Sequence, residues 1–147
     1  MNNDDINADI RAVLEKMIQL EVSKIKPSMD EEDERLHRKI EMMQPVIDAF
    51  IGIPKDLLDE AGISVSATPG NLGASIRDFG TYSSCSYFFT TTIDGSAYEV
   101  ERHESYSFDG EGGQDTSVKT YDSPDKLIEI GLRMIAEKAG KKRAKEK

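Results

Sequence analysis

The sequence predicts an α+β protein, with N-terminal helices, an antiparallel meander of four or five strands, and a C-terminal helix packed on one face of the sheet. Before Gly62, apolar residues recur at every third or fourth position, the spacing of amphipathic helices. Beyond Gly62 they alternate with polar residues, and Ser, Thr, Gly and Tyr become frequent, which is typical of strands. The helical spacing returns after Pro124.

At 147 residues the chain has the length of one domain with its own hydrophobic core. We expect a single domain over residues 1–140, with a helical part at 5–61, a sheet part at 63–121 and a closing helix at 124–140. Residues 141–147 are rich in lysine and are predicted to form a basic flexible tail.

The first helix is predicted over residues 6–25, where aliphatic residues form one stripe. Pro27 is expected to end it, because proline lacks the backbone donor that a helix interior needs. A second helix is predicted to begin at once, since Ser28 and Glu31 have the spacing of a capping box.

This second helix continues over residues 36–50, where large apolar residues recur at steps of three and four. Pro45 is expected to kink or divide it. Pro54 suits the first turn of a short third helix, and Gly62 suits its end.

Residues 63–67 alternate apolar and polar side chains and predict the first strand, and residues 74–79 predict a short second strand. The strongest local signal is Asp94-Gly95 between two β-rich runs, because this dipeptide favours the two-residue turn of a β-hairpin. We therefore expect a hairpin centred on these two residues.

A turn at Asp94-Gly95 fixes the register of that hairpin. One face then holds most of the aromatic and aliphatic residues and is expected to pack on the helices. Its pairs are Ile93 with Ser96, Thr91 with Tyr98, Phe89 with Val100, Tyr87 with Arg102 and Cys85 with Glu104. The opposite face, which pairs Ser86 with His103, is expected to face water.

A glycine-rich connection is predicted over residues 109–115, and a last strand over residues 116–121. Alternating carboxylates make the connection superficially similar to a calcium-binding loop. Such a loop needs glycine at its sixth position and glutamate at its twelfth, and these are Gln114 and Thr120. We therefore expect a solvated loop and no metal site.

The net charge of −9 sets limits on partners and location. An acidic chain repels a phosphate backbone, so direct nucleic-acid binding is not expected. The longest purely apolar run is three residues, far short of the ~20 that span a bilayer, so no membrane partner is expected. The lone Cys85 and the acidic N-terminus, which is unlike a secretory signal, favour the cytoplasm.

Cys85 and His103 are the first candidates for catalysis, because an imidazole close to a thiol can accept its proton. The predicted register places their side chains on opposite faces of the sheet, so Cys85 is interpreted as a small buried apolar residue. The chain carries no motif for a cofactor or a catalytic nucleophile, and none is expected. The sequence thus favours a non-enzyme.

The candidate binding site is a polar group on the helix-facing side of the hairpin. Arg102 and Glu104 fall there among tyrosines, and buried charges are costly unless they are paired. The two residues therefore form either an ion pair at the rim of the sheet or a hydrogen-bonded patch that binds a partner. Arginine and tyrosine are frequent interface anchors, so we predict binding through Tyr87, Arg102, Glu104 and Tyr106.

The leading functional hypothesis is a non-catalytic acidic interaction module, a regulator, inhibitor or adaptor that binds a protein partner. One variant is an inhibitor that mimics nucleic acid with its carboxylates, as a small acidic protein of a phage or mobile element could. The main alternative is a small enzyme or ligand-binding domain with a pocket between sheet and helices. A homo-oligomer, joined through an uncovered helix stripe, is a further alternative.

Overall fold

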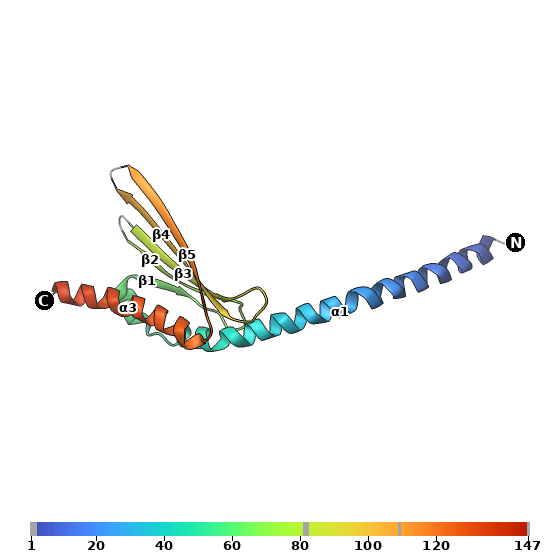
Figure 1. Cartoon of the computed structure of the whole chain (residues 1–147), viewed down its shortest axis with the longest axis horizontal. Coiled ribbons are helices and arrows are strands. Elements are labelled where there is room, and N and C mark those ends of the chain that lie inside the picture. Colours follow the sequence, from blue (N-terminus) through green and yellow to red (C-terminus); the bar gives the residue numbers. More distant parts are fainter. Residues whose placement is uncertain (1–2, 81–82, 109, 147) are drawn as a thin grey trace. The chain divides into compact units, whose positions relative to one another are not determined.

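The computed structural model describes residues 3–80, 83–108 and 110–146 and has the predicted α+β fold (Figure 1). Its elements are α1 (Asn3–Ile51), α2 (Lys55–Ala61), β1 (Ile63–Ser66), β2 (Ala74–Phe79), β3 (Ser83–Thr91), β4 (Tyr98–Phe108), β5 (Glu111–Tyr121) and α3 (Pro124–Glu146). The chain divides into two compact units with the boundary between His37 and Arg38. None of the helices in the described ranges combines the length and apolarity that a membrane span requires.

The first unit is helical, and the predicted break at Pro27 is wrong. α1 runs through Pro27 and also through Pro45, so Ser28 and Glu31 lie inside a helix and cap nothing. A proline inside a helix removes one backbone hydrogen bond and costs about 3 kcal/mol, which the good helix formers on both sides can offset. Every residue from 7 to 37 is exposed.

The second unit contains a five-stranded antiparallel meander in the order β1-β2-β3-β4-β5. The predicted register of β3 against β4 is confirmed, with Tyr87 opposite Arg102 and Cys85 opposite Glu104. β3 ends at Thr91 and β4 begins at Tyr98, so the predicted two-residue turn is wrong and residues 92–97 form a longer connection. Ile93, predicted on the helix-facing side opposite Ser96, lies in this connection and is 87% exposed. The predicted register is still correct, because Asp94 and Gly95 lie at the centre of the connection.

Asp94 organises this connection through its carboxylate. Its Oδ1 accepts hydrogen bonds from the Thr92 hydroxyl (2.7 Å), the Ser96 hydroxyl (2.7 Å) and the Ser96 backbone N–H (3.1 Å). These hydrogen bonds lower the pKa of Asp94 from 3.8 to about 2. Gly95 follows with a φ of +70°, a conformation that favours glycine.

The predicted glycine-rich loop at 109–115 is wrong, since Glu111 to Asp115 belong to β5 and pair with β4. Asp109 lies outside the described residues. Gly113 lies opposite Tyr106, and a Cβ added to it would approach the tyrosine hydroxyl to 2.3 Å. Glycine therefore leaves the space that the Tyr106 ring occupies.

The core lies between the sheet and the helices of the second unit. Phe50 of α1 meets Phe89 of β3 edge to face, with ring centroids 5.0 Å apart. The Tyr98 hydroxyl donates to the Met42 carbonyl (3.0 Å), which ties β4 to α1. The buried apolar residues are Met43, Val46, Ile47, Phe50, Ala61, Ile63, Ala74, Ile76, Phe89, Tyr98, Val100, Leu127, Ile135 and Ala139.

α3 lies against this core and passes it most closely at Gly131. A Cβ at that position would approach the Phe50 ring to 2.7 Å and the Ile76 Cδ1 to 2.8 Å. The helix continues to Glu146, so residues 141–146 are helical where a flexible tail is expected. Near its end, Arg143 Nε donates to both carboxylate oxygens of Glu60 of α2, at 2.6 and 3.0 Å.

Gly131→Ala is expected to destabilise the fold by about 1–3 kcal/mol, although alanine is the better helix former. The added methyl group has no free volume between Phe50 and Ile76, both fully buried. Gly140→Ala in the same helix is the matched control, because no atom lies within 4 Å of its Cβ. We expect that variant to gain about 0.5–1 kcal/mol. Urea denaturation measures both, and equal effects would contradict this close contact.

Asp94→Ala is expected to lower the melting temperature at pH 7 and to lower it much less at pH 2. The folded pKa of about 2 lies below the unfolded value, so the ionised carboxylate stabilises the fold above pH 4. That contribution is lost as the pH falls towards 2. Melting curves of both proteins across this range test it, and a difference independent of pH would show that the charge is unimportant.

Candidate binding cleft between the sheet and α3

A half-open cleft of about 620 Å³ lies between α3 and the helix-facing side of the sheet. Its residues come from β2 to β5 and from one side of α3. They are Asp78, Cys85, Tyr87, Val100, Arg102, Glu104, Ser117, Lys119, Tyr121, Ile130, Arg133, Met134, Glu137, Lys138 and Lys141. The cleft thus begins where the packed core ends, on the same face of the sheet.

Arg102 forms the floor of the cleft with Glu104 and Tyr87. Its Nη1 and Nη2 donate to the two carboxylate oxygens of Glu104, at 3.1 and 2.7 Å, and its Nε donates to the Tyr87 hydroxyl at 3.2 Å. The guanidinium carbon lies 5.9 Å from the centre of the Tyr87 ring. Arg102 and Glu104 are thus paired with each other, and the arginine is also hydrogen-bonded to Tyr87.

Burial and hydrogen bonding act on Arg102 in opposite directions. Partial burial disfavours its charge, but the bonds to Glu104 and Tyr87 outweigh this and raise the pKa of Arg102 above its usual value. The side chains of Arg102 and Glu104 are 38% and 42% exposed, so solvent screens the pair. The pair therefore fixes the orientation of the guanidinium more than it stabilises the fold.

Cys85, predicted to be buried, is half-buried and lines the same cleft. Burial raises its pKa, and the nearby charge of Arg102 offsets this in part. His103 is on the opposite face, where its Nε2 lies 3.0 Å from Glu101 Oε1 and its Nδ1 lies 3.1 Å from the Thr116 hydroxyl. The separation of Cys85 from His103 that the register predicts is confirmed.

Cations outnumber carboxylates around the cleft, five to three. Lys138 of α3 is bound to Asp78 of β2, with Nζ and Oδ2 3.1 Å apart. Within the part of the chain that the structure describes, neither Lys119 nor Lys141 has a carboxylate within 4 Å. These two lysines are the cations of the cleft that remain open to a ligand.

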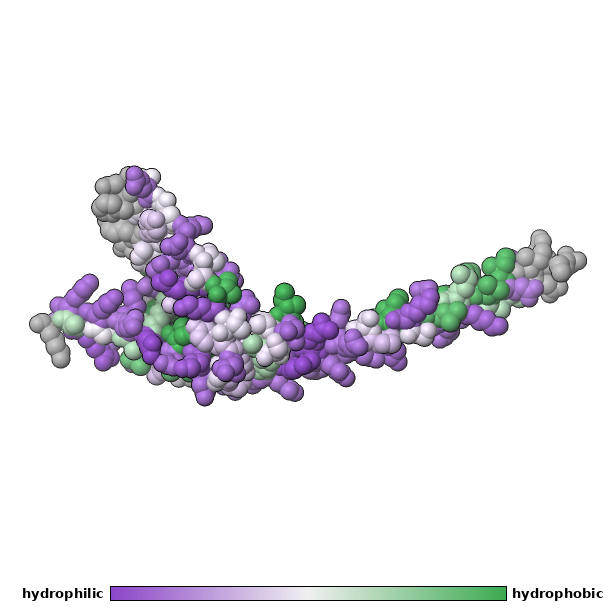
Figure 2. Space-filling view, viewed as in Figure 1, coloured by the Kyte–Doolittle hydropathy of each residue, from purple (hydrophilic) through white to green (hydrophobic). Residues whose placement is uncertain are grey.

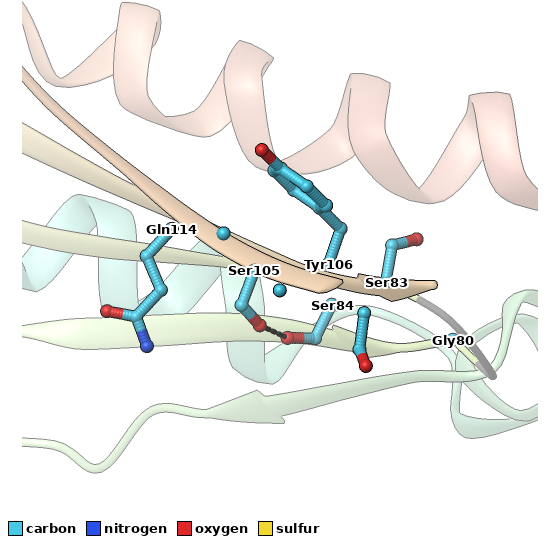
Figure 3. Close-up of a pocket in the computed structure, with 9 residues that line it drawn as sticks. Gly80, Ser83, Ser84, Ser105, Tyr106 and Gln114 are labelled. Carbon is cyan, nitrogen blue, oxygen red and sulfur yellow. Dashed lines mark hydrogen bonds between the residues drawn. The ribbon is translucent and has the colours of Figure 1, made fainter. Parts of the chain in front are cut away.

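Tyr106, the fourth predicted binding residue, lies apart from the other three. Its side chain points to the α3 side of the sheet near Ser83, whereas Ser84 and Ser105 point to the other face, their hydroxyl oxygens 2.6 Å apart (Figure 3). Tyr106 is 55% exposed and does not line the cleft. The binding role of all four residues remains a prediction.

The sequence interpretation missed the part of the cleft that α3 provides. Ile130, Met134, Lys138 and Lys141 recur at helical spacing along one side of that helix, which is the signal that could have revealed it. Among the described residues, no group of three His, Cys, Asp or Glu side chains is placed to hold a metal ion. Comparisons with family models, curated proteins and solved structures found no match.

Iodoacetamide is expected to modify Cys85 several-fold more slowly at pH 8 in the folded protein than in the urea-unfolded chain. Burial both raises its pKa and limits access, and the thiolate is the reactive form. Mass spectrometry of timed samples measures both rates. Faster modification of the folded protein would indicate an activated thiol and would revive a catalytic role.

Proposed function

We propose that this protein is a non-catalytic interaction module, a regulator, inhibitor or adaptor that binds a partner protein in the cleft between the sheet and α3. The observation that supports it best is the local charge of the cleft. A chain with a net charge of −9 gathers five cations against three carboxylates there. Such a cleft attracts a carboxylate-bearing segment that the rest of the surface repels.

Two sets of side chains in the cleft contribute to the proposed binding in different ways. Arg102, Glu104 and Tyr87 are bonded to one another and give the floor a fixed shape before any partner arrives. Preorganised contacts cost less side-chain entropy on binding. Lys119 and Lys141 supply ammonium groups on long stems, which can reach the carboxylates of an acidic segment.

The groups that could act in catalysis are poorly disposed for it. Cys85 carries a raised pKa, and the imidazole that could accept its proton is on the other face of the sheet. Both carboxylate oxygens of Glu104 accept hydrogen bonds from Arg102, so this carboxylate is poorly placed to accept a proton from a substrate. These features support binding over chemistry.

A small-ligand-binding domain is the second candidate, because the cleft is concave and combines polar groups with Tyr87, Tyr121 and Met134. A volume of about 620 Å³ suits a small organic anion as well as a peptide segment. The two candidates differ in the size of the molecule bound.

Affinity capture from native-host extract, with a charge-reversed cleft as comparison, tests the proposal. We expect the unmodified protein to retain a partner that Lys119→Glu/Lys141→Glu loses, with affinity lowered about tenfold or more. Lys55→Glu/Lys142→Glu is the matched control, with the same change in net charge at residues that do not line the cleft.

Equal capture by both variants would reject the cleft as the protein-binding site. If neither variant nor the unmodified protein retained a partner, and a small organic anion raised the melting temperature of the unmodified protein alone, the second candidate would replace the first.

A further inference from the structure

The first unit carries an apolar stripe that the candidate cleft does not involve. Figure 2 shows green apolar patches along the N-terminal part of α1, separated by purple hydrophilic residues. Each of the ten is between 44% and 60% exposed. They are Ile10, Val13, Leu14, Met17, Ile18, Leu20, Val22, Ile25, Met29 and Leu36.

From this surface we infer that residues 7–36 of α1 bind the same segment of a second copy of the chain as an antiparallel helix pair. The inference is independent of the proposed function of the cleft. Large aliphatic side chains at spacings of three and four are the surface that a second helix packs against.

The length of the segment is sufficient for a stable pair. Thirty helical residues extend about 45 Å. Seven of these side chains share one face of the helix, and burying them on both copies would remove on the order of 1,000 Å² of total surface, the size at which specific interfaces begin. They are Ile10, Leu14, Met17, Ile18, Ile25, Met29 and Leu36. Self-association requires no other protein, because every copy of the chain carries the same segment.

The charge pattern of the segment selects the antiparallel orientation. Five acidic residues follow one another at Asp30–Glu34, while Lys24 and Lys26 precede them on the other side of Pro27. A parallel pair in register would place one acidic block against the other. An antiparallel pair that crosses near Pro27 places each acidic block opposite residues 20–24 of the other copy, where the charges of Glu21 and Lys24 cancel, and so avoids that repulsion.

The same crossing aligns the apolar residues. With Pro27 at the centre, Ile25 of one copy comes opposite Met29 of the other, and Ile18 comes opposite Leu36. Lys24 lies 3.6 Å from Glu21 of its own helix, but both side chains are largely exposed, so this ion pair is weak and free to exchange.

Sedimentation equilibrium of the full chain tests association. We expect a species of twice the 16.4 kDa chain mass. Ile18→Glu/Ile25→Glu should weaken the dimer about a hundredfold or more, because each copy would bury two carboxylates in the contact. Gln19→Glu/Ser23→Glu, which adds the same charge beside the stripe, should change it about threefold at most. A monomer at all concentrations, or a dimer equally sensitive to both variants, would overturn the inference.

The orientation is tested by the direction of a charge-reversal effect. In an antiparallel pair, Asp30→Lys places a lysine opposite Lys24 of the other copy and weakens the dimer, and adding Lys24→Glu restores it. In a parallel pair, Asp30→Lys relieves acid–acid repulsion and strengthens the dimer. Strengthening by Asp30→Lys would therefore overturn the antiparallel assignment.

Discussion

The register of β3 against β4 is the constraint on which the second unit depends. It places Phe89, Tyr98 and Val100 on the side that α1 and α3 cover, and it places Arg102 and Glu104 farther along that same side. Side chains alternate between the faces of a strand, so a slip of one residue would send the core residues to solvent and bring Glu99, Glu101 and His103 inward. The core and the cleft are thus consequences of one alignment.

The helical layer is held by equally close steric limits. Phe50 meets Phe89 on one side, while Gly131 lets α3 approach the Phe50 ring on the other. Any larger residue at 131 would push α3 away from the sheet, and α3 carries the far wall of the cleft. Core packing at Gly131 and the position of Lys138 and Lys141 are therefore linked through a single rigid element.

Local sequence patterns predict much of this structure, and they fail where contacts between distant segments determine the secondary structure. Asp94-Gly95 predicts the register, since a turn dipeptide acts within a few residues. Pro27 does not end the helix, because a chain with strong helix formers on both sides can lose one hydrogen bond and continue.

Glu111 to Asp115 have poor strand propensity, yet β4 offers them a row of backbone partners, and pairing with it outweighs propensity. In the cleft, cross-strand pairing brings Tyr87, Arg102 and Glu104 together, whereas the contribution of α3 depends on helix packing that no local pattern specifies.

The cleft follows from the change in polarity along one face of the sheet. Close to the 92–97 connection this face is aliphatic and aromatic, and the helices cover it completely. At Tyr87 and Arg102 it becomes polar, and a buried polar surface must satisfy its own hydrogen bonds or remain open to water. Arg102 satisfies its hydrogen bonds within the protein, because its three side-chain nitrogens donate to Glu104 and Tyr87. The rest of this polar surface lines the cleft and remains open to water. Because the arginine is already satisfied, the proposed binding of an acidic segment depends on Lys119 and Lys141 rather than on the guanidinium.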